Sequence, residues 1–190
     1  MTTKNTTTMR TFNVPVKAEV SPNNQAIFDN LQKGLGFVPN LYAVMAYSEH
    51  GLAKYLQLQG APSQLTKKEK EVVNLVVSQV NGCRYCQSAH TVIGKMNGLT
   101  DEQVLDIRSG TAAFDTKLDA LTKLAKATTL TKGRPDTAAL DAFFNAGYTN
   151  AHLVEVVIAI ADKVVMNYLN NIMQVPIDFP VAAELQPAKA

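Results

Sequence analysis

Residues 66–90 read TKKEKEVVNLVVSQVNGCRYCQSAH, and this stretch decides the fold. Thr66 and Glu69 have the form of a capping box, which predicts that a helix begins here. The valines at 72, 73, 76, 77 and 80 form one apolar stripe at helical spacing. Asn81 and Gly82 tolerate the backbone conformations that end a helix, so a second helix is expected to begin at the cysteines. We therefore predict a helical hairpin that turns at Gly82.

The rest of the sequence also indicates helices. It contains no convincing alternating strand pattern and no flanked Asn-Gly or Asp-Gly turn. We therefore predict an all-α fold, with the cysteine pair at the start of a helix. The last long helix is apolar on nearly all sides, so we expect it to be central or to form a subunit contact. Caps, glycines and prolines predict helices at about 21–36, 38–45, 48–59, 66–81, 83–97, 100–110, 115–132, 136–146 and 149–173.

Length and composition suit one small protein domain. The chain has 190 residues, of which 46% are hydrophobic, enough for one core. We expect a flexible N-terminal arm over 1–14, a single all-helical domain over 15–180 and a C-terminal tail over 181–190.

Charge and hydropathy argue against two classes of partner. The net charge is +2 and no basic run stands out, so a nucleic-acid groove is not indicated. The most apolar stretch, residues 153–166, is interrupted by charges and is too short to span a bilayer. Residues 1–10 are polar, with no apolar segment typical of a signal peptide. We expect a cytoplasmic protein with no membrane or nucleic-acid partner.

The two cysteines are the strongest chemical signal. Cys83 and Cys86 are the only cysteines, and His90 lies four residues after the second. At about 100° per residue, the three side chains share one helix face. The first turn of a helix stabilises a thiolate through its free amide groups and dipole. This pattern favours redox chemistry at a thiol pair.

Glu71 is a candidate partner for His90. If the two helices of the hairpin are antiparallel, Glu71 lies about 16 Å from the turn and His90 about 12 Å, at 1.5 Å per residue. The two side chains would then be near neighbours, and the carboxylate would orient the ring. However, Glu71 lies off the centre of the valine stripe, and the helical pattern alone predicts that it is exposed.

Other interpretations of the pair remain open. The cysteines could be two small buried residues or half of a zinc site, and His90 a structural histidine. Zinc prefers four ligands, and two thiolates with His90 leave one missing. A c-type haem site needs a histidine directly after the second cysteine, where Gln87 stands.

The full spacing of these residues resembles a known family motif. Glu71, eleven residues, Cys83, two residues, Cys86, three residues and His90 resemble the core motif of the alkylhydroperoxidase D-like family. That family belongs to the carboxymuconolactone decarboxylase superfamily. Residues 36–42, GFVPNLY, are similar to the entry of the first helices in its peroxidase-related branch.

The resemblance implies an all-helical homotrimer or homohexamer that reduces organic hydroperoxides. It implies that Cys86 is the peroxidatic thiol and Cys83 the resolving thiol, with His90 and Glu71 as the proton relay. An external dithiol would restore the pair, and no flavin, haem or metal cofactor is required. The best-studied members have a histidine where Tyr85 stands, so the relay here is expected to be shorter or to pass through water.

Two further expectations complete the functional prediction. Decarboxylation is disfavoured, because decarboxylases of the superfamily work without this cysteine pair. The alternative function is a non-enzymatic thiol–disulfide switch or a partner-binding helical oligomer. Candidates for the wall of a substrate pocket are Phe37, Tyr42, Met45 and Tyr47.

Overall fold

The computed structural model describes residues 11–185, and over that range all of the regular secondary structure is helical. This confirms the predicted fold class. Residues 1–10 of the predicted arm and 186–190 of the predicted tail lie outside the described range. The elements are η1 (Lys17–Glu19), α1 (Pro22–Leu35), α2 (Asn40–Met45), α3 (Gly51–Gly60), α4 (Lys67–Val80), α5 (Arg84–Met96), α6 (Asp101–Ser109), α7 (Thr116–Leu130), α8 (Thr137–Asn145) and α9 (Asn150–Met173).

Local capping sets the helix boundaries. The predicted capping box is present at the start of α4: Thr66 Oγ1 accepts from the Glu69 amide at 3.2 Å, and the Glu69 carboxylate accepts from the Thr66 amide at 2.8 Å. Gly82 has a φ of +66°, a conformation that a side chain would strain, and it makes the sharp turn into α5 possible. The helix predicted from Ser48 begins instead at Gly51, because Ser48 Oγ accepts from the Gly51 amide at 3.1 Å ahead of the first turn.

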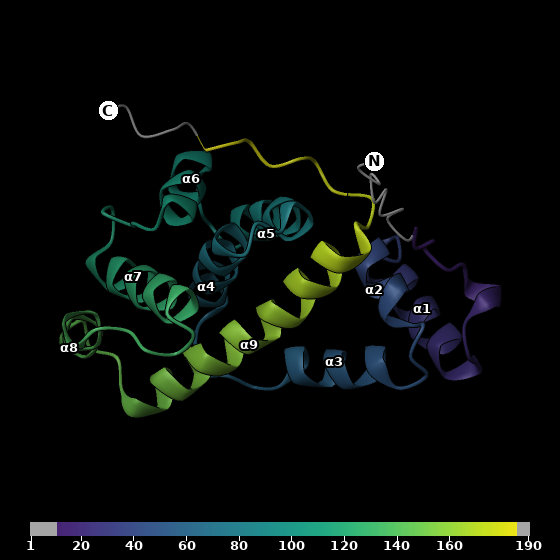
Figure 1. The fold of residues 1–190 in the computed structure, drawn as a ribbon, viewed down its shortest axis with the longest axis horizontal. Helices are drawn as coiled ribbons and strands as arrows, with labels where there is room; N and C mark the ends of the chain where they lie inside the picture. The colour runs from purple at the N-terminus through teal and green to yellow at the C-terminus, as the bar shows by residue number, and fades with distance from the viewer. Residues whose placement is uncertain (1–10, 186–190) are drawn as a thin grey trace, which may run out of the picture.

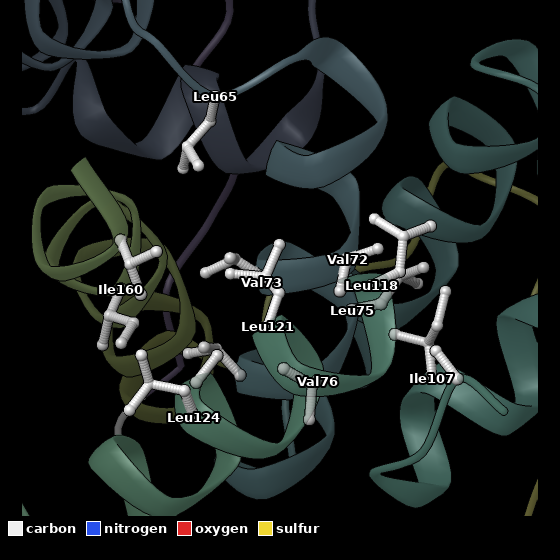
Figure 2. Close-up of a cluster of buried hydrophobic side chains, with 14 of the residues drawn as sticks. Leu65, Val72, Val73, Leu75, Val76, Ile107, Leu118, Leu121, Leu124 and Ile160 are labelled. Atoms are coloured by element: carbon white, nitrogen blue, oxygen red, sulfur yellow. The ribbon is translucent and has the colours of Figure 1, made fainter. Parts of the chain in front are cut away.

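The main core surrounds α4. This helix packs against α5, α6, α7 and α9, and it lies behind α9 at the centre of the molecule (Figure 1). Its valine stripe meets leucines of α7 and isoleucines of α6 and α9, such as Leu121, Ile107 and Ile160 (Figure 2). Full burial of one such side chain contributes about 1.5–3 kcal/mol, so this cluster holds the α4–α5 hairpin firmly in place.

A second apolar cluster contains both cysteines. It joins Cys83, Tyr85 and Cys86 of the α5 region to residues of α2, α3 and α9, including Leu41 and Met166. The cysteine pair therefore packs where α2 and α3 meet α5 and α9.

α9 crosses the molecule diagonally and is buried on one side only (Figure 1). The other side exposes six large apolar side chains: Val154, Val157, Ile158, Val165, Tyr168 and Ile172. This exposed apolar face is compatible with a subunit contact on α9, which stays a prediction. Among the described residues, no helix has the length and apolar character needed to cross a membrane.

After α9 the chain returns across α5 towards α6 (Figure 1). The Ala182 amide donates to Ser88 Oγ at 3.0 Å, and Arg108 Nη1 donates to the Ala183 carbonyl at 2.7 Å. Residues 181–185, part of the predicted tail, are thus packed on the cysteine helix and its neighbour.

Candidate active site

The close approach of α4 and α5 creates the site. Gly94 of α5 faces α4, and a Cβ atom there would lie 3.2 Å from Leu99 Cδ1, 3.5 Å from Leu75 Cδ1 and 3.9 Å from Glu71 Cβ. A methyl group there would press on Leu99, whereas its distances to α4 are those of ordinary van der Waals contact. The small residue therefore lies at the close contact between the two helices that carry Glu71 and His90.

The cysteine pair begins α5. Cys83 is the N-cap residue, and its Sγ accepts a hydrogen bond from the Cys86 amide at 3.2 Å. Both side chains are buried, and both cysteines are free thiols. This confirms the prediction that the pair stands at a helix start, where free amide groups stabilise negative charge.

The pKa values of the two thiols shift in opposite directions. The hydrogen bond from Cys86 lowers the pKa of Cys83, against the effect of burial, and the Cys86 amide, Asn167 and the positive charge of Lys163 lower it further. The same interaction with Cys83, together with burial, raises the pKa of Cys86. These opposite shifts favour a pair with one negative charge, held as a thiolate on Cys83 while Cys86 keeps its proton.

Glu71 and His90 form a buried pair. His90 Nδ1 lies 2.7 Å from Glu71 Oε2, and the other carboxylate oxygen, Oε1, accepts from Asn74 Nδ2 at 2.9 Å. The predicted meeting of the two residues is confirmed. The stripe pattern predicts that Glu71 is exposed, and this prediction is wrong, because Glu71 is only 6% exposed. α5 covers this side of α4, a contact that the periodicity of α4 alone does not contain.

Burial and charge set the protonation of this pair. Burial raises the pKa of Glu71, but His90, Lys163 and Asn74 outweigh it and the pKa is lowered. Burial and the charge of Lys163 lower the pKa of His90, although Glu71 opposes them. We assign an ionised Glu71 and a neutral His90 that donates through Nδ1, which leaves Nε2 as a free base.

Cys86 and His90 line a cavity of about 730 Å³, whereas Cys83 is not part of its wall. The wall is largely apolar, with Phe37 and Tyr42 as predicted, and with Phe179 from the C-terminal segment. Met45 and Tyr47 do not line it; they lie at another hollow beside α9. Tyr42 lies on the side of α2 that faces the cavity, whereas Met45 and Tyr47, at the end of α2 and in the following loop, lie on another side.

Tyr85 packs in the same cluster as the two cysteines, and its hydroxyl is held by α2. Its hydroxyl accepts from the Leu41 amide at 3.2 Å, and its ring meets Phe179 edge-on. Burial and a hydrogen bond to Asp178 raise its pKa. The phenol therefore braces α2 against α5 and is a poor proton donor or acceptor for the cysteine pair.

α9 contributes two polar residues that the sequence reasoning did not select. Asn167 donates to Ser78 Oγ at 3.3 Å and interacts with both cysteines. Lys163 is 1% exposed and lines the cavity with Cys86. Both could have been selected as polar residues within the most apolar helix, because such residues are seldom buried without a partner or a function.

Among residues 11–185, no cluster of three or more histidine, cysteine, aspartate or glutamate side chains is arranged to hold a metal ion. The site groups themselves are a thiol pair, an imidazole–carboxylate pair, and a lysine that lines an apolar cavity.

Comparisons with known proteins agree with this geometry. The carboxymuconolactone decarboxylase family model matches residues 46–130, which include all four predicted site residues. No curated protein sequence matches the chain.

Solved structures extend the likeness to most of the chain. An uncharacterised peroxidase-related protein from Ralstonia eutropha, described as an alkylhydroperoxidase AhpD core, has a TM-score of 0.80 at 19% identity and covers 90% of this chain and 93% of that one. A peroxidase-related protein from a Silicibacter species has a TM-score of 0.75 at 19% identity, covering 92% and 95%. A cysteine-to-alanine variant of the debrominase Bmp8, in complex with 2,3,4-tribromopyrrole, has a TM-score of 0.75 at 20% identity, covering 90% and 93%.

These matches confirm the resemblance seen in the motif. Residues 46–130 hold the cysteine pair and its partners, and the structural likeness includes the helices on both sides of that segment. Residues 46–130 thus match the carboxymuconolactone decarboxylase family model, and the chain as a whole has the AhpD-like helical fold.

Proposed function

We propose that the protein is a thiol-dependent alkyl hydroperoxide reductase. The observation that carries this proposal is the position of Cys86, whose backbone amide donates to Cys83 Sγ and whose side chain forms part of the wall of an apolar cavity. Only the second cysteine lines this cavity, which supports Cys86 as the attacking thiol and Cys83 as the resolving one. We propose an external dithiol as reductant, a homotrimer or homohexamer as assembly, and the cytoplasm as location.

The reaction follows from the two thiols. The Sγ atom of Cys86 attacks the terminal oxygen of the hydroperoxide while its proton passes to the Cys83 thiolate. An S–O bond forms, the O–O bond breaks, and an alcohol leaves after protonation. Cys83 then displaces hydroxide from the sulfenic acid to give the disulfide. His90 exchanges protons between the pair and solvent, and Glu71 stabilises its protonated form.

The cavity favours an organic over an inorganic peroxide. Its aromatic and aliphatic wall gains free energy by burying an apolar group, about 25 cal/mol per Å², which hydrogen peroxide does not offer. The debrominase of this fold holds a ring compound, 2,3,4-tribromopyrrole, and that binding supports a substrate with an apolar body here.

Free-thiol counting on the reduced protein tests the proposal. One equivalent of tert-butyl hydroperoxide should rapidly remove both thiols of the wild type and leave an intramolecular disulfide. Cys86→Ser should lose this reaction, whereas Cys83→Ser should form a sulfenic acid that a dimedone probe traps. Unchanged peroxide consumption by Cys86→Ser would contradict the assignment.

A non-enzymatic thiol–disulfide switch is the second candidate. The observation that favours it is the attachment of the C-terminal segment to the cysteine helix, where Arg84 Nη2 donates to the Ala182 carbonyl at 3.0 Å. Thiol loss over hours, together with a change in assembly or in protease sensitivity of this segment on oxidation, would favour the switch over the peroxidase.

A further inference from the structure

Lys163 is a buried lysine without a hydrogen bond among the described residues. Its side chain is 2% exposed, and the nearest carboxylate oxygen, Oδ2 of Asp162, is 3.9 Å from Nζ, beyond hydrogen-bond distance. Asp162 itself lines a second hollow on the Glu71 side, whereas Lys163 lines the cavity with Cys86. Burial of an ammonium group is costly unless it is paired and hydrogen-bonded, so a buried Lys163 without a hydrogen bond points to a function.

The proposed reaction needs a proton donor that the other cavity residues do not provide. The departing alkoxide is strongly basic, and its protonation at the moment of O–O cleavage speeds the reaction. Neutral His90 already donates Nδ1–H to Glu71, and its Nε2 is a base. In this neutral state His90 is a base, so a cationic side chain of the wall is the better source of the proton.

The phenols of the wall are poor candidates. The Tyr42 hydroxyl donates to Gln59 at 2.6 Å, and burial raises its pKa to about 12. Tyr55 accepts from Gln59, and burial raises its pKa as well. The remaining cations of the wall are Lys67, which is exposed, and Lys163, which is buried beside the thiols.

We propose that the Lys163 ammonium gives its proton to the oxygen that leaves when Cys86 attacks an alkyl hydroperoxide. This inference rests on the peroxidase function proposed above. Lys163 shares the cavity wall with Cys86 and His90, so a peroxide bound there can contact all three side chains.

The step balances in atoms and charge. Cys86–SH passes its proton to the Cys83 thiolate, and its sulfur takes the terminal OH of ROOH. The RO⁻ group takes a proton from Lys163, giving ROH and a neutral amine. Cys83–SH then returns a proton to the amine and attacks the sulfenic acid, and the hydroxide that leaves takes that proton to form water. The amine regains its proton from solvent.

Two oxidants separate proton donation from other roles. tert-Butyl hydroperoxide releases a basic alkoxide, whereas peracetic acid releases a carboxylate that is stable without a proton. In single-turnover oxidation of reduced protein, Lys163→Met should slow the first reaction about 10²-fold or more and leave the second nearly unchanged. Lys163→Arg keeps the charge but does not release a proton at accessible pH, so it should behave like Lys163→Met.

Controls make each outcome informative. Lys54→Met changes an exposed lysine of α3 and should leave both rates unaltered. In the wild type, deuterium oxide should slow the reaction with tert-butyl hydroperoxide more than that with peracetic acid, a test that needs no variant. Equal slowing of both oxidants by Lys163→Met, or full rescue by Lys163→Arg, would overturn the proposal. A wild type inert to tert-butyl hydroperoxide would instead refute the peroxidase function itself.

Discussion

Replacing either member of the buried Glu71–His90 pair should change stability by a different amount, because Glu71 is charged and His90 is neutral. Replacing His90 by alanine removes the closest partner of a buried carboxylate whose Oε2 lies 2.7 Å from the ring. Because His90 is neutral, the loss is that of a hydrogen bond to a buried charged group, which costs about 1.5–3 kcal/mol of unfolding free energy. Replacing Glu71 by glutamine removes the charge but keeps an acceptor for Nδ1–H, and the lost charge assistance costs about 1 kcal/mol.

The double variant tests the cause. With Glu71→Gln present, His90→Ala no longer leaves a charge without its partner, so the double variant should be more stable than His90→Ala alone by about 1–3 kcal/mol. Urea unfolding at pH 7 and one fixed protein concentration, followed by circular dichroism, measures all three variants. A double variant less stable than His90→Ala would refute a buried, ionised Glu71.

The pH dependence should follow the same assignment. The pKa of His90 is lowered in the folded state by burial, so the unfolded chain takes up a proton first as pH falls below the ordinary value of about 6.5. Stability from this group is present above that value and is lost as pH falls. The His90→Ala deficit should therefore shrink between pH 7 and pH 5, and a constant deficit would argue against a neutral buried imidazole.

Two shorter predictions concern the surroundings of the site. Tyr85→Phe removes the acceptor of the buried Leu41 amide, so it should lower unfolding free energy by about 1–3 kcal/mol while leaving most of the thiol oxidation rate. A large rate loss without destabilisation would instead place the phenol in the proton relay. On α9, Val157→Lys and Ile172→Lys put charges on the exposed apolar face and should reduce the assembly mass measured by analytical ultracentrifugation. An unchanged mass would show that subunits meet elsewhere.

The sequence contained enough information for the helical framework and the hairpin. The signals for this part are local: the Thr66 capping box, the valine stripe and Gly82. Their effect depends on hydrogen bonds and backbone sterics between residues close in the sequence. For the same reason the meeting of Glu71 with His90 could be worked out from helical rise. The start of α3 at Gly51 was missed because a serine side chain caps equally well from more than one register.

The parts that could not be predicted depend on contacts between distant segments. Burial of Glu71 depends on the packing of α5 against α4 next to Gly94, and a glycine within a helix carries no signal for its partner. The arrival of Lys163 and Asn167 at the cysteines depends on the crossing of α9 over α4 and α5. A lysine in an apolar helix indicates a special position, but not which cavity it reaches.

The proposed roles of the two cysteines differ because the thiol that lines the cavity is not the thiol with the lowered pKa. Cys86 lines the cavity, yet its interaction with Cys83 keeps its proton in place. Cys83 is the better thiolate but does not line the cavity. If only one thiolate is stable, attack by Cys86 requires Cys83 to accept its proton in the same step. The resolving cysteine would then also serve as the base of the first step, and Cys83→Ser should slow sulfenic acid formation as well as prevent the disulfide.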